Sequence, residues 1–408
     1  MIFLKIIRGF LSVLYRELEF SEFLCDKFQG KNSITSPQEL FEVVSKLTGD
    51  EFLAQEAYNG AKLSSMQIRI TPYVIAMINW DNFVHCPIRK QYISLSSELV
   101  SPTQLSKFDS LDERSSTPIP GLVHRYPNKV LLLLTSNCPS YCSYCTRSYS
   151  VGSSSDIMKK DKNVVGRDNL EEIIEYIDKH KIVDVLVSGG DIYYANHKLL
   201  VDISKRLLNL ESVKRIRYAT KSLAFEPSKF LSGSKLRSAL EEINTEARKE
   251  FKKISIQVHF NHPRELNSIV LDFSNWAFSN CIEVRNQSVL LRGINNDLNT
   301  LIELNTKLSK MNINPYYIYV SDIVPGVEHL RTSIDEALYL QKNILGFDSG
   351  YCQPSFIVDL PSGGGKKPIS LFDSYSNGVA VYSSPVIDNK RKYEYVDPYE
   401  SINIKNVV

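Results

Sequence analysis

The sequence predicts an α/β protein in which short strands and amphipathic helices alternate to build a partial (β/α)6-type barrel. From about residue 124, apolar strand-like runs alternate regularly with helical runs. This alternation implies right-handed crossovers and a parallel sheet. Glycine-rich, cysteine-rich and acidic segments directly follow several of these strands, at the ends that meet on one face of a parallel barrel. We therefore expect the functional residues on that face.

The expected N-terminal helical region and linker cover residues 1–120. Residues 1–20 are apolar but carry interrupting basic residues, which favours a mostly buried first helix over a signal or membrane segment. SPQELFEVVSKL (36–47) opens with a serine cap and has helical apolar spacing. SPTQLSKFDSLDERSSTPIPG (101–121) is polar and rich in turn residues, which indicates a linker.

The expected barrel occupies residues 121–370, and a short C-terminal extension follows over 371–408. Its expected strands are 129–134, 182–187, 213–219, 254–260, 282–291, 315–320 and 355–360. Its expected helices include 168–180, 197–210, 235–253, 298–311 and 333–345. The pattern predicts six or seven units.

Composition places the chain among ordinary soluble globular proteins. Of its 408 residues, 43% are hydrophobic and 23% charged, and the net charge is only +2. This balance excludes a broad nucleic-acid surface and implies no acidic partner. The seven cysteines are odd in number and four are scattered, so we expect no disulfide framework and a reducing, cytoplasmic setting.

Three cysteines, Cys138, Cys142 and Cys145, lie within the segment TSNCPSYCSYCTR. A structural zinc site needs four ligands, and no fourth cysteine or histidine lies at a fitting distance in the sequence. Three thiolates suit a 4Fe–4S cluster that leaves one iron open for S-adenosylmethionine. The spacing C-x3-C-x2-C after an apolar strand is the radical SAM signature, and it disfavours the alternative of three ordinary buried cysteines.

Two glycine-rich segments follow other strands. SGGD contains Ser188, Gly189, Gly190 and Asp191, and its glycines let the backbone approach a ligand closely. Alone it would indicate only a turn, but beside the cysteines it favours contact with the cofactor.

The second segment is DLPSGGGKKP, which carries Lys366. It is either a flexible surface loop or a turn that presents this lysine to a crowded site. There, desolvation makes an amine nucleophilic and able to hold pyridoxal phosphate as a Schiff base. Arg125, in HRYPNKV, is expected to begin the first strand.

Ordered motifs between about residues 70 and 370 resemble the lysine 2,3-aminomutase family. They are TPYVIAMINWDN, PIRKQ, HRYPNKVLLLLTSNCPSYCSYCTR, VSGGD, HFNHPRE, RNQSVLLRGIN, PYYIYVSDIVPGVEHLRT, SGYC and FIVDLPSGGGKKP. The resemblance implies that the three cysteines bind the cluster and that Lys366 binds pyridoxal phosphate. Arg125 would contact its phosphate, and Gln287 the adenosyl cofactor. The fold implied is a radical SAM partial barrel.

The resemblance also implies a substrate. Arg147 would clamp its carboxylate, and Asp322 with Asp359 would hold its side-chain ammonium. Two carboxylates attract a cation and repel a glutamate side chain, so a basic amino acid is favoured, with L-lysine converted to β-lysine. Arginine, ornithine or a modified lysine are alternatives, and so are two merely solvated aspartates.

Other functions and partners remain open. The chain could catalyse a different radical reaction of a biosynthetic pathway, whereas a non-enzymatic relative would not need both cofactors. No cysteine follows Cys352, so we expect no structural zinc of the kind that these mutases often carry. We expect a flavodoxin- or ferredoxin-type electron donor and a small amino-acid substrate, with no nucleic-acid or membrane partner. A homo-oligomer is left open.

Overall fold

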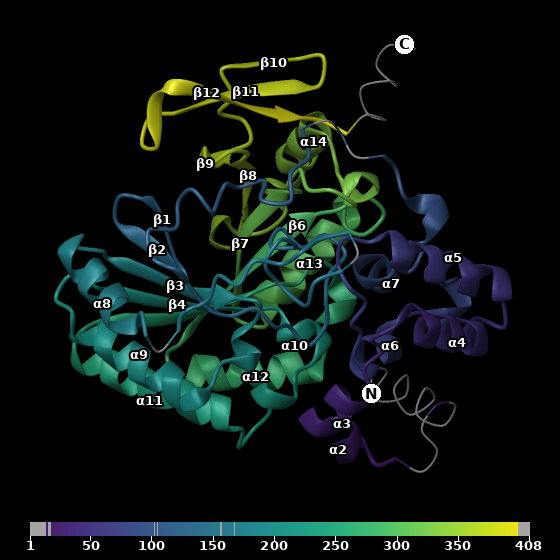
Figure 1. The fold of residues 1–408 in the computed structure, drawn as a ribbon, viewed down its shortest axis with the longest axis horizontal. Coiled ribbons are helices and arrows are strands. Elements are labelled where there is room, and N and C mark those ends of the chain that lie inside the picture. Colours follow the sequence, from purple (N-terminus) through teal and green to yellow (C-terminus); the bar gives the residue numbers. More distant parts are fainter. Residues whose placement is uncertain are drawn as a thin grey trace.

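The computed structural model describes residues 14, 18–101, 103, 105–155, 157–166 and 168–398. The first helix expected over residues 1–20 lies outside these residues, apart from residues 14 and 18–20. Figure 1 shows a barrel-like sheet wrapped by helices, with a helical N-terminal region at one side and a small sheet over one end. The prediction of an α/β partial barrel is confirmed.

The N-terminal region consists of short helices around a hydrophobic core that also includes Phe225 and Ile269 of the barrel region. They are α2 (Phe20–Phe23), α3 (Asp26–Lys31), α4 (Pro37–Thr48), α5 (Glu51–Leu63), α6 (Pro72–Met77) and α7 (Pro87–Tyr92). Helix α4 begins where its sequence predicts, because the Ser36 side chain accepts a hydrogen bond from the Glu39 amide. Gly49 ends it in the left-handed conformation.

The main sheet contains nine strands in sequence order. They are β1 (Leu122–Tyr126), β2 (Lys129–Thr135), β3 (Asp184–Gly189), β4 (Arg215–Thr220), β5 (Lys253–Val258), β6 (Glu283–Leu290), β7 (Ile313–Val320), β8 (Ser355–Leu360) and β9 (Gly365–Pro368). Strands β2 to β8 run parallel, whereas β1 and β9 are antiparallel edge strands. The Lys366 amide donates a 2.9 Å hydrogen bond to the Tyr126 hydroxyl, which joins the two edges.

One local expectation is wrong. Arg125 does not begin the first parallel strand but lies on β1, which precedes it and runs antiparallel to it. The chain reverses at Pro127 and Asn128, and Tyr126 is then paired with Lys129. Proline and asparagine both favour a turn, and this turn separates the two strands.

The helices cover the outside of the barrel (Figure 1). They are α8 (Leu170–Lys179), α9 (His197–Asn209), α10 (Ser222–Phe225), α11 (Lys235–Lys249), α12 (Ser268–Ser279), α13 (Leu298–Lys310) and α14 (Ile334–Ile344). Side chains before five of them accept hydrogen bonds from first-turn amides: Asn196, Ser234, Asn267, Asp297 and Ser333. These caps fix where each helix begins. No helix in the described part of the chain is long and apolar enough to cross a membrane.

The segment after β9, where the sequence predicts a short C-terminal extension, forms a three-stranded antiparallel sheet. Its strands are β10 (Ser374–Ser376), β11 (Val379–Ser384) and β12 (Asp388–Val396). Figure 1 shows it in yellow above β8 and β9. The Tyr395 hydroxyl donates to the Ser321 carbonyl at 2.8 Å, and the Tyr382 hydroxyl to the Ile369 carbonyl at 2.9 Å. Both hydrogen bonds fasten this sheet to the barrel.

Candidate functional site

The three cysteines lie on the loop that leaves the carboxyl end of β2. Backbone hydrogen bonds attach this loop to the N-terminal region: the Tyr141 amide donates to the Arg69 carbonyl, and the Ser143 amide to the Gln91 carbonyl, each at 2.9 Å. All three cysteines are free of disulfides. They line one cavity of about 300 Å³, which we call the thiol cavity.

The environment of the cysteines keeps their thiols protonated. Burial raises the pKa of Cys138 well above its usual range, with nearby Asp191 adding to the effect. Burial likewise raises the pKa of Cys142 to about 12 and the pKa of Cys145. Holding these groups as thiolates therefore requires a positively charged partner.

The arrangement of the thiols fits a cluster better than a single ion. Among the described residues, no three His, Cys, Asp or Glu side chains converge closely enough to bind one metal ion. A 4Fe–4S cluster bonds each thiolate to a different iron, so its ligands need not converge on one point. Three separated thiols around one cavity match that requirement.

The SGGD segment runs from the end of β3 alongside the start of the cysteine loop. A side chain at Gly189, whose φ is +119°, would place its Cβ 2.2 Å from the Thr135 carbonyl oxygen. A Cβ at Gly190 would lie 2.3 Å from the carbonyl oxygen of Asn137. Both glycines are therefore required for the close backbone contact between the two segments.

Asp191 connects the carboxyl ends of β3 and β4. Its carboxylate accepts hydrogen bonds from the Thr220 hydroxyl and the Lys221 amide, both at 2.7 Å, and from the Tyr193 amide at 2.9 Å. Burial raises its pKa to about 6. The segment also lines the thiol cavity, where a ligand can reach its backbone.

Lys366 and Asp359 face each other across a hairpin made by β8 and β9. Residues directly opposite in an antiparallel pair point to the same side of the sheet. The Lys366 Nζ lies 3.8 Å from Asp359 Oδ2 and donates a 2.8 Å hydrogen bond to the Tyr319 hydroxyl. The register of the hairpin thus places an amine and a carboxylate together.

The glycine turn before Lys366 is packed rather than loose. A Cβ at Gly364 would lie 2.6 Å from the Tyr393 ring of β12, and one at Gly365 would lie 2.9 Å from the Tyr126 hydroxyl. The Ser362 amide also donates a 2.8 Å hydrogen bond to the carbonyl of residue 110. These contacts hold the backbone that carries Lys366, whose side chain is 34% exposed.

The two substrate-binding candidates, Asp322 and Asp359, differ in their partners. Arg125 Nη1 lies 3.3 Å from Asp359 Oδ1. Asp322 instead accepts a 2.5 Å hydrogen bond from the neutral Thr146 hydroxyl. Burial and the nearby charge of Asp359 raise the pKa of Asp322 to about 7. Below that pH, the Asp322 carboxyl is therefore protonated.

Arg147 makes a two-bond contact with Glu113, a residue that the sequence analysis assigned only to a linker. Nε and Nη2 each donate at 2.9 Å to the two carboxylate oxygens, and the Tyr149 hydroxyl donates to the same carboxylate at 2.7 Å. Burial opposes ionisation of Glu113, but the Arg147 guanidinium holds its pKa below its usual value. This side-on contact leaves the Nη1 edge of the guanidinium for a second carboxylate.

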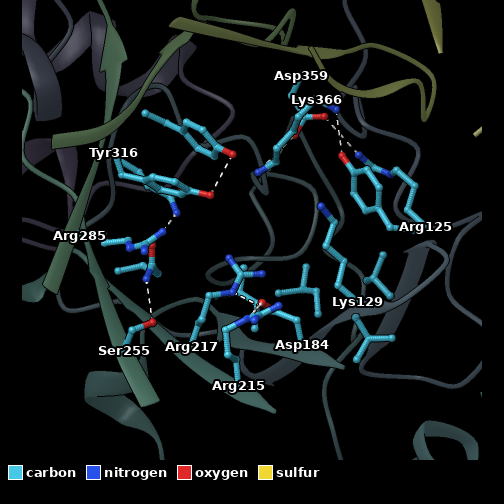
Figure 2. A pocket seen from close by; sticks show the side chains of 18 of the residues that line it. Arg125, Lys129, Asp184, Arg215, Arg217, Ser255, Arg285, Tyr316, Asp359 and Lys366 are labelled. Carbon is cyan, nitrogen blue, oxygen red and sulfur yellow. Dashed lines mark hydrogen bonds and ion pairs between the residues drawn. The ribbon is translucent and has the colours of Figure 1, made fainter. Parts of the chain in front are cut away.

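A larger cavity of about 790 Å³ adjoins the thiol cavity, and we call it the basic cavity (Figure 2). Residues common to both walls include Arg147, Gln287, Asp359 and Lys366, so the two spaces meet there. Every predicted site residue except Arg125 lines the thiol cavity. Arg125 lines the basic cavity, and its buried Nε has no hydrogen-bond partner among the described residues.

Several residues near Lys366 were missed by sequence reasoning. Tyr319 and Tyr126 contact it directly, and Lys129 points into the basic cavity beside it (Figure 2). The Gln287 amide donates to Gln257 at 3.1 Å, which holds it at the junction of the two cavities. Tyr319 could have been predicted from the sequence, because it lies near the end of β7, shortly before Asp322. Lys129 gave no signal beyond its charge.

No family model matches the chain. It is similar to the L-lysine 2,3-aminomutase of Fusobacterium nucleatum, with 34% identity over 345 residues, which are 84% of this chain and 75% of that one. The L-lysine 2,3-aminomutase of Clostridium subterminale is 30% identical over 388 residues, 91% of this chain and 87% of that one. The glutamate 2,3-aminomutase of Clostridioides difficile is 29% identical over 346 residues, 84% of this chain and 76% of that one.

Proposed function

The chain belongs to the lysine 2,3-aminomutase family, and on this premise we propose a pyridoxal phosphate-dependent radical SAM enzyme that moves the α-amino group of a basic amino acid to the β-carbon. L-lysine, giving β-lysine, is the substrate that we favour. One observation carries the proposal: the Lys366–Asp359 pair sits where a cavity lined by three thiols meets a cavity lined by cations. A radical SAM aminomutase that uses pyridoxal phosphate needs its coenzyme-binding lysine between a thiol-lined site for the cluster and a cationic site for the coenzyme phosphate.

The residues suit both cofactors. Cys138, Cys142 and Cys145 would hold the cluster, and the SGGD backbone with Gln287 would hold S-adenosylmethionine. Lys366 would hold pyridoxal phosphate, with the unpartnered Nε of Arg125 as a donor for its phosphate. When bound, the cluster with S-adenosylmethionine supplies hydrogen-atom abstraction, and pyridoxal phosphate supplies a conjugated ring for the migrating nitrogen.

The protein's own contribution is placement and charge. Arg147 keeps one edge of its guanidinium for the substrate carboxylate while Glu113 fixes the plane of the group. Asp322 and Asp359 present negative charge to the side chain, which favours an ammonium or guanidinium over a carboxylate. Glu113 and Asp359 are buried, which limits water at these two carboxylates.

Other substrates remain as alternatives within this proposal. Arginine, ornithine or a modified lysine would carry the same side-chain charge at a different distance from the α-carbon. A different radical reaction on a basic amino acid would use the same cysteines and Lys366. A flavodoxin- or ferredoxin-type donor in the cytoplasm would supply the electron. The distinguishing observation is the product, because only an aminomutase returns a β-amino isomer of its substrate.

The first test is spectroscopic. Protein purified without oxygen and supplied with pyridoxal phosphate should show both iron–sulfur absorbance and the band of a lysine-bound coenzyme. Lys366→Ala should lose the second band, whereas Lys367→Ala should keep it, because Lys367 is paired with Val358 and lies on the opposite side of β9. Iron–sulfur absorbance without a coenzyme band in the unmodified protein would overturn the aminomutase proposal.

The second test identifies the substrate. The loaded enzyme is incubated with S-adenosylmethionine, a reductant and separate amino acids, and products are scored by mass and retention. We expect a β-amino isomer from lysine or another basic amino acid and none from glutamate. Turnover of glutamate at a comparable rate would contradict the role given to the two aspartates.

A further inference from the structure

The basic cavity enters the barrel from the end opposite to the cysteines. Its walls include the first residue of five successive strands: Lys129, Asp184, Arg215, Lys253 and Glu283. The thiol cavity is instead bounded by residues that follow strands at their carboxyl ends. The two cavities meet at Lys366 and Asp359. The described residues therefore leave Lys366 reachable from both ends of the barrel.

The rim of the basic cavity is exposed, and the side chains farther in are partly covered. Lys214, Arg215 and Lys253 are exposed at the rim, and the Phe251 side chain beside them is 97% exposed. Farther in, the Arg217 side chain is only 21% exposed. Figure 2 shows Lys129 and Lys366 pointing into the space between Arg217 and Asp359. A path of cationic groups thus leads from solvent toward Lys366.

The charges along this path are not balanced. Arg215 and Arg217 share one carboxylate, Asp184, at 3.0 and 2.7 Å. Arg285 is paired with Glu283 at 2.7 Å. The remaining cations of the outer part of the cavity, Lys129, Lys214 and Lys253, line its wall and take part in none of the ion pairs found among the described residues. Six cations facing two carboxylates in a concave wall produce a strong positive potential.

We propose that the basic cavity is the entrance through which a phosphorylated coenzyme, pyridoxal phosphate, reaches Lys366. The inference rests on the proposed function and adds a route to it. The phosphate dianion is attracted along the lysines, whereas a cationic amino acid is repelled and has to enter from the thiol cavity. A volume of about 790 Å³ is ample for a ligand of this size.

Association kinetics test the route. The full-length chain is freed of coenzyme and mixed rapidly with pyridoxal phosphate, and the rise of the lysine-bound band gives the association rate constant. Lys214→Glu/Lys253→Glu reverses two rim charges. Lys342→Glu/Lys235→Glu changes the net charge equally at exposed helix positions outside the cavity. Both variants replace exposed side chains, so both are expected to fold.

We expect the rim variant to associate about tenfold more slowly at low salt and to lose most of the salt dependence, with the dissociation rate unchanged. The control variant should stay within about twofold of the unmodified protein. Pyridoxal, which lacks the phosphate, should associate equally with all three, and inorganic phosphate should slow the coenzyme only where the rim lysines are intact.

Three results would overturn the route. They are equal slowing of pyridoxal phosphate association in both variants, no slowing in the rim variant, or slowing of pyridoxal in the rim variant by the same factor as pyridoxal phosphate. An unmodified protein that never forms the band would overturn the proposed function and the route with it, which keeps the two failures distinguishable.

Discussion

Replacing Glu113 by glutamine is expected to destabilise the protein and to weaken its hold on the substrate carboxylate. The Glu113 carboxylate accepts two hydrogen bonds of 2.9 Å from Arg147 and one of 2.7 Å from Tyr149. Glutamine keeps a single acceptor oxygen and turns an NH2 group toward the other donors. At least one donor therefore loses its acceptor, and the guanidinium loses its counter-charge.

The magnitude follows from the burial of the pair. A hydrogen bond to a charged group contributes about 1.5–3 kcal/mol, and removing one partner of a buried ion pair costs about 3–5 kcal/mol. The Arg147 side chain is 23% exposed, so water replaces part of what is lost. We expect the free energy of unfolding to fall by about 2–3 kcal/mol. We also expect KM to rise about tenfold with a smaller change in kcat, because the guanidinium plane is no longer fixed.

Glu98→Gln is the matched control. Glu98 makes the same kind of two-bond contact with Arg89, at 2.5 and 2.8 Å, but neither residue lines a cavity of the site. Urea unfolding should show a loss of stability in both variants, and steady-state kinetics should show a raised KM only for Glu113→Gln. An unchanged or lower KM would refute the orienting role, since it would mean that Glu113 competes with the substrate for Arg147.

Three further predictions concern the same region. Asp322 has a pKa of about 7 in the folded protein against 3.8 as its reference value, so it contributes stability at low pH that is lost as pH rises through 7. The melting temperature of the ligand-free protein, compared with that of Asp322→Asn, should therefore fall between pH 5 and pH 8. Gly364→Ala should push its methyl group into Tyr393 and reduce coenzyme loading measured by absorbance, whereas Gly350→Ala, with no atom near its Cβ, should not. Tyr126→Phe removes the acceptor of an amide in β9 and should speed hydrogen exchange of that amide, with no change in the distant helix α4.

The sequence could predict the barrel and the grouping of its site because both depend on local pattern. The apolar runs expected to be strands at 182–187 and 355–360 correspond to β3 (Asp184–Gly189) and β8 (Ser355–Leu360) in the structure. Parallel strands bring their carboxyl ends to one face, so residues after different strands meet even when they are far apart in the chain. Cys138, Asp322 and Lys366 line one cavity for this reason. This grouping could be predicted from the order of strands alone, without knowledge of any contact between the residues.

Two local features were not predicted from the sequence, although each has a turn signal. Pro127 and Asn128 separate β1 from β2 and so place Arg125 on an antiparallel strand. Asn377 and Gly378 both have positive φ values, 51° and 74°, which are typical of a two-residue hairpin turn. That turn joins β10 to β11 in a segment for which we expected only a short extension.

Glu113 and Lys129 could not be identified from sequence for a different reason. Their significance depends on partners brought close by the fold, not on neighbours in the chain. Glu113 lies in a polar stretch whose composition indicates a linker, yet it is 3% exposed beneath Arg147. A lone carboxylate in such a stretch is normally solvated. Only the folded structure distinguishes a solvated carboxylate from one that is buried and paired with an arginine.

The two aspartates have different partners, and under the proposed function this difference limits the substrate. Asp359 is already faced by two cations, Arg125 at 3.3 Å and Lys366 at 3.8 Å, whereas the hydrogen-bond partner of Asp322 among the described residues is the neutral Thr146 hydroxyl. Once the Lys366 amine is engaged by a coenzyme, Arg125 Nη1 still lies beside Asp359 while its Nε would serve the phosphate. An entering side-chain cation therefore finds one uncompensated carboxylate, Asp322, and has to displace its proton when the pH is below about 7. The site is balanced for a single positive charge, so we expect amino-acid affinity to rise with pH through 7 for lysine and its cationic analogues and to stay flat for neutral side chains.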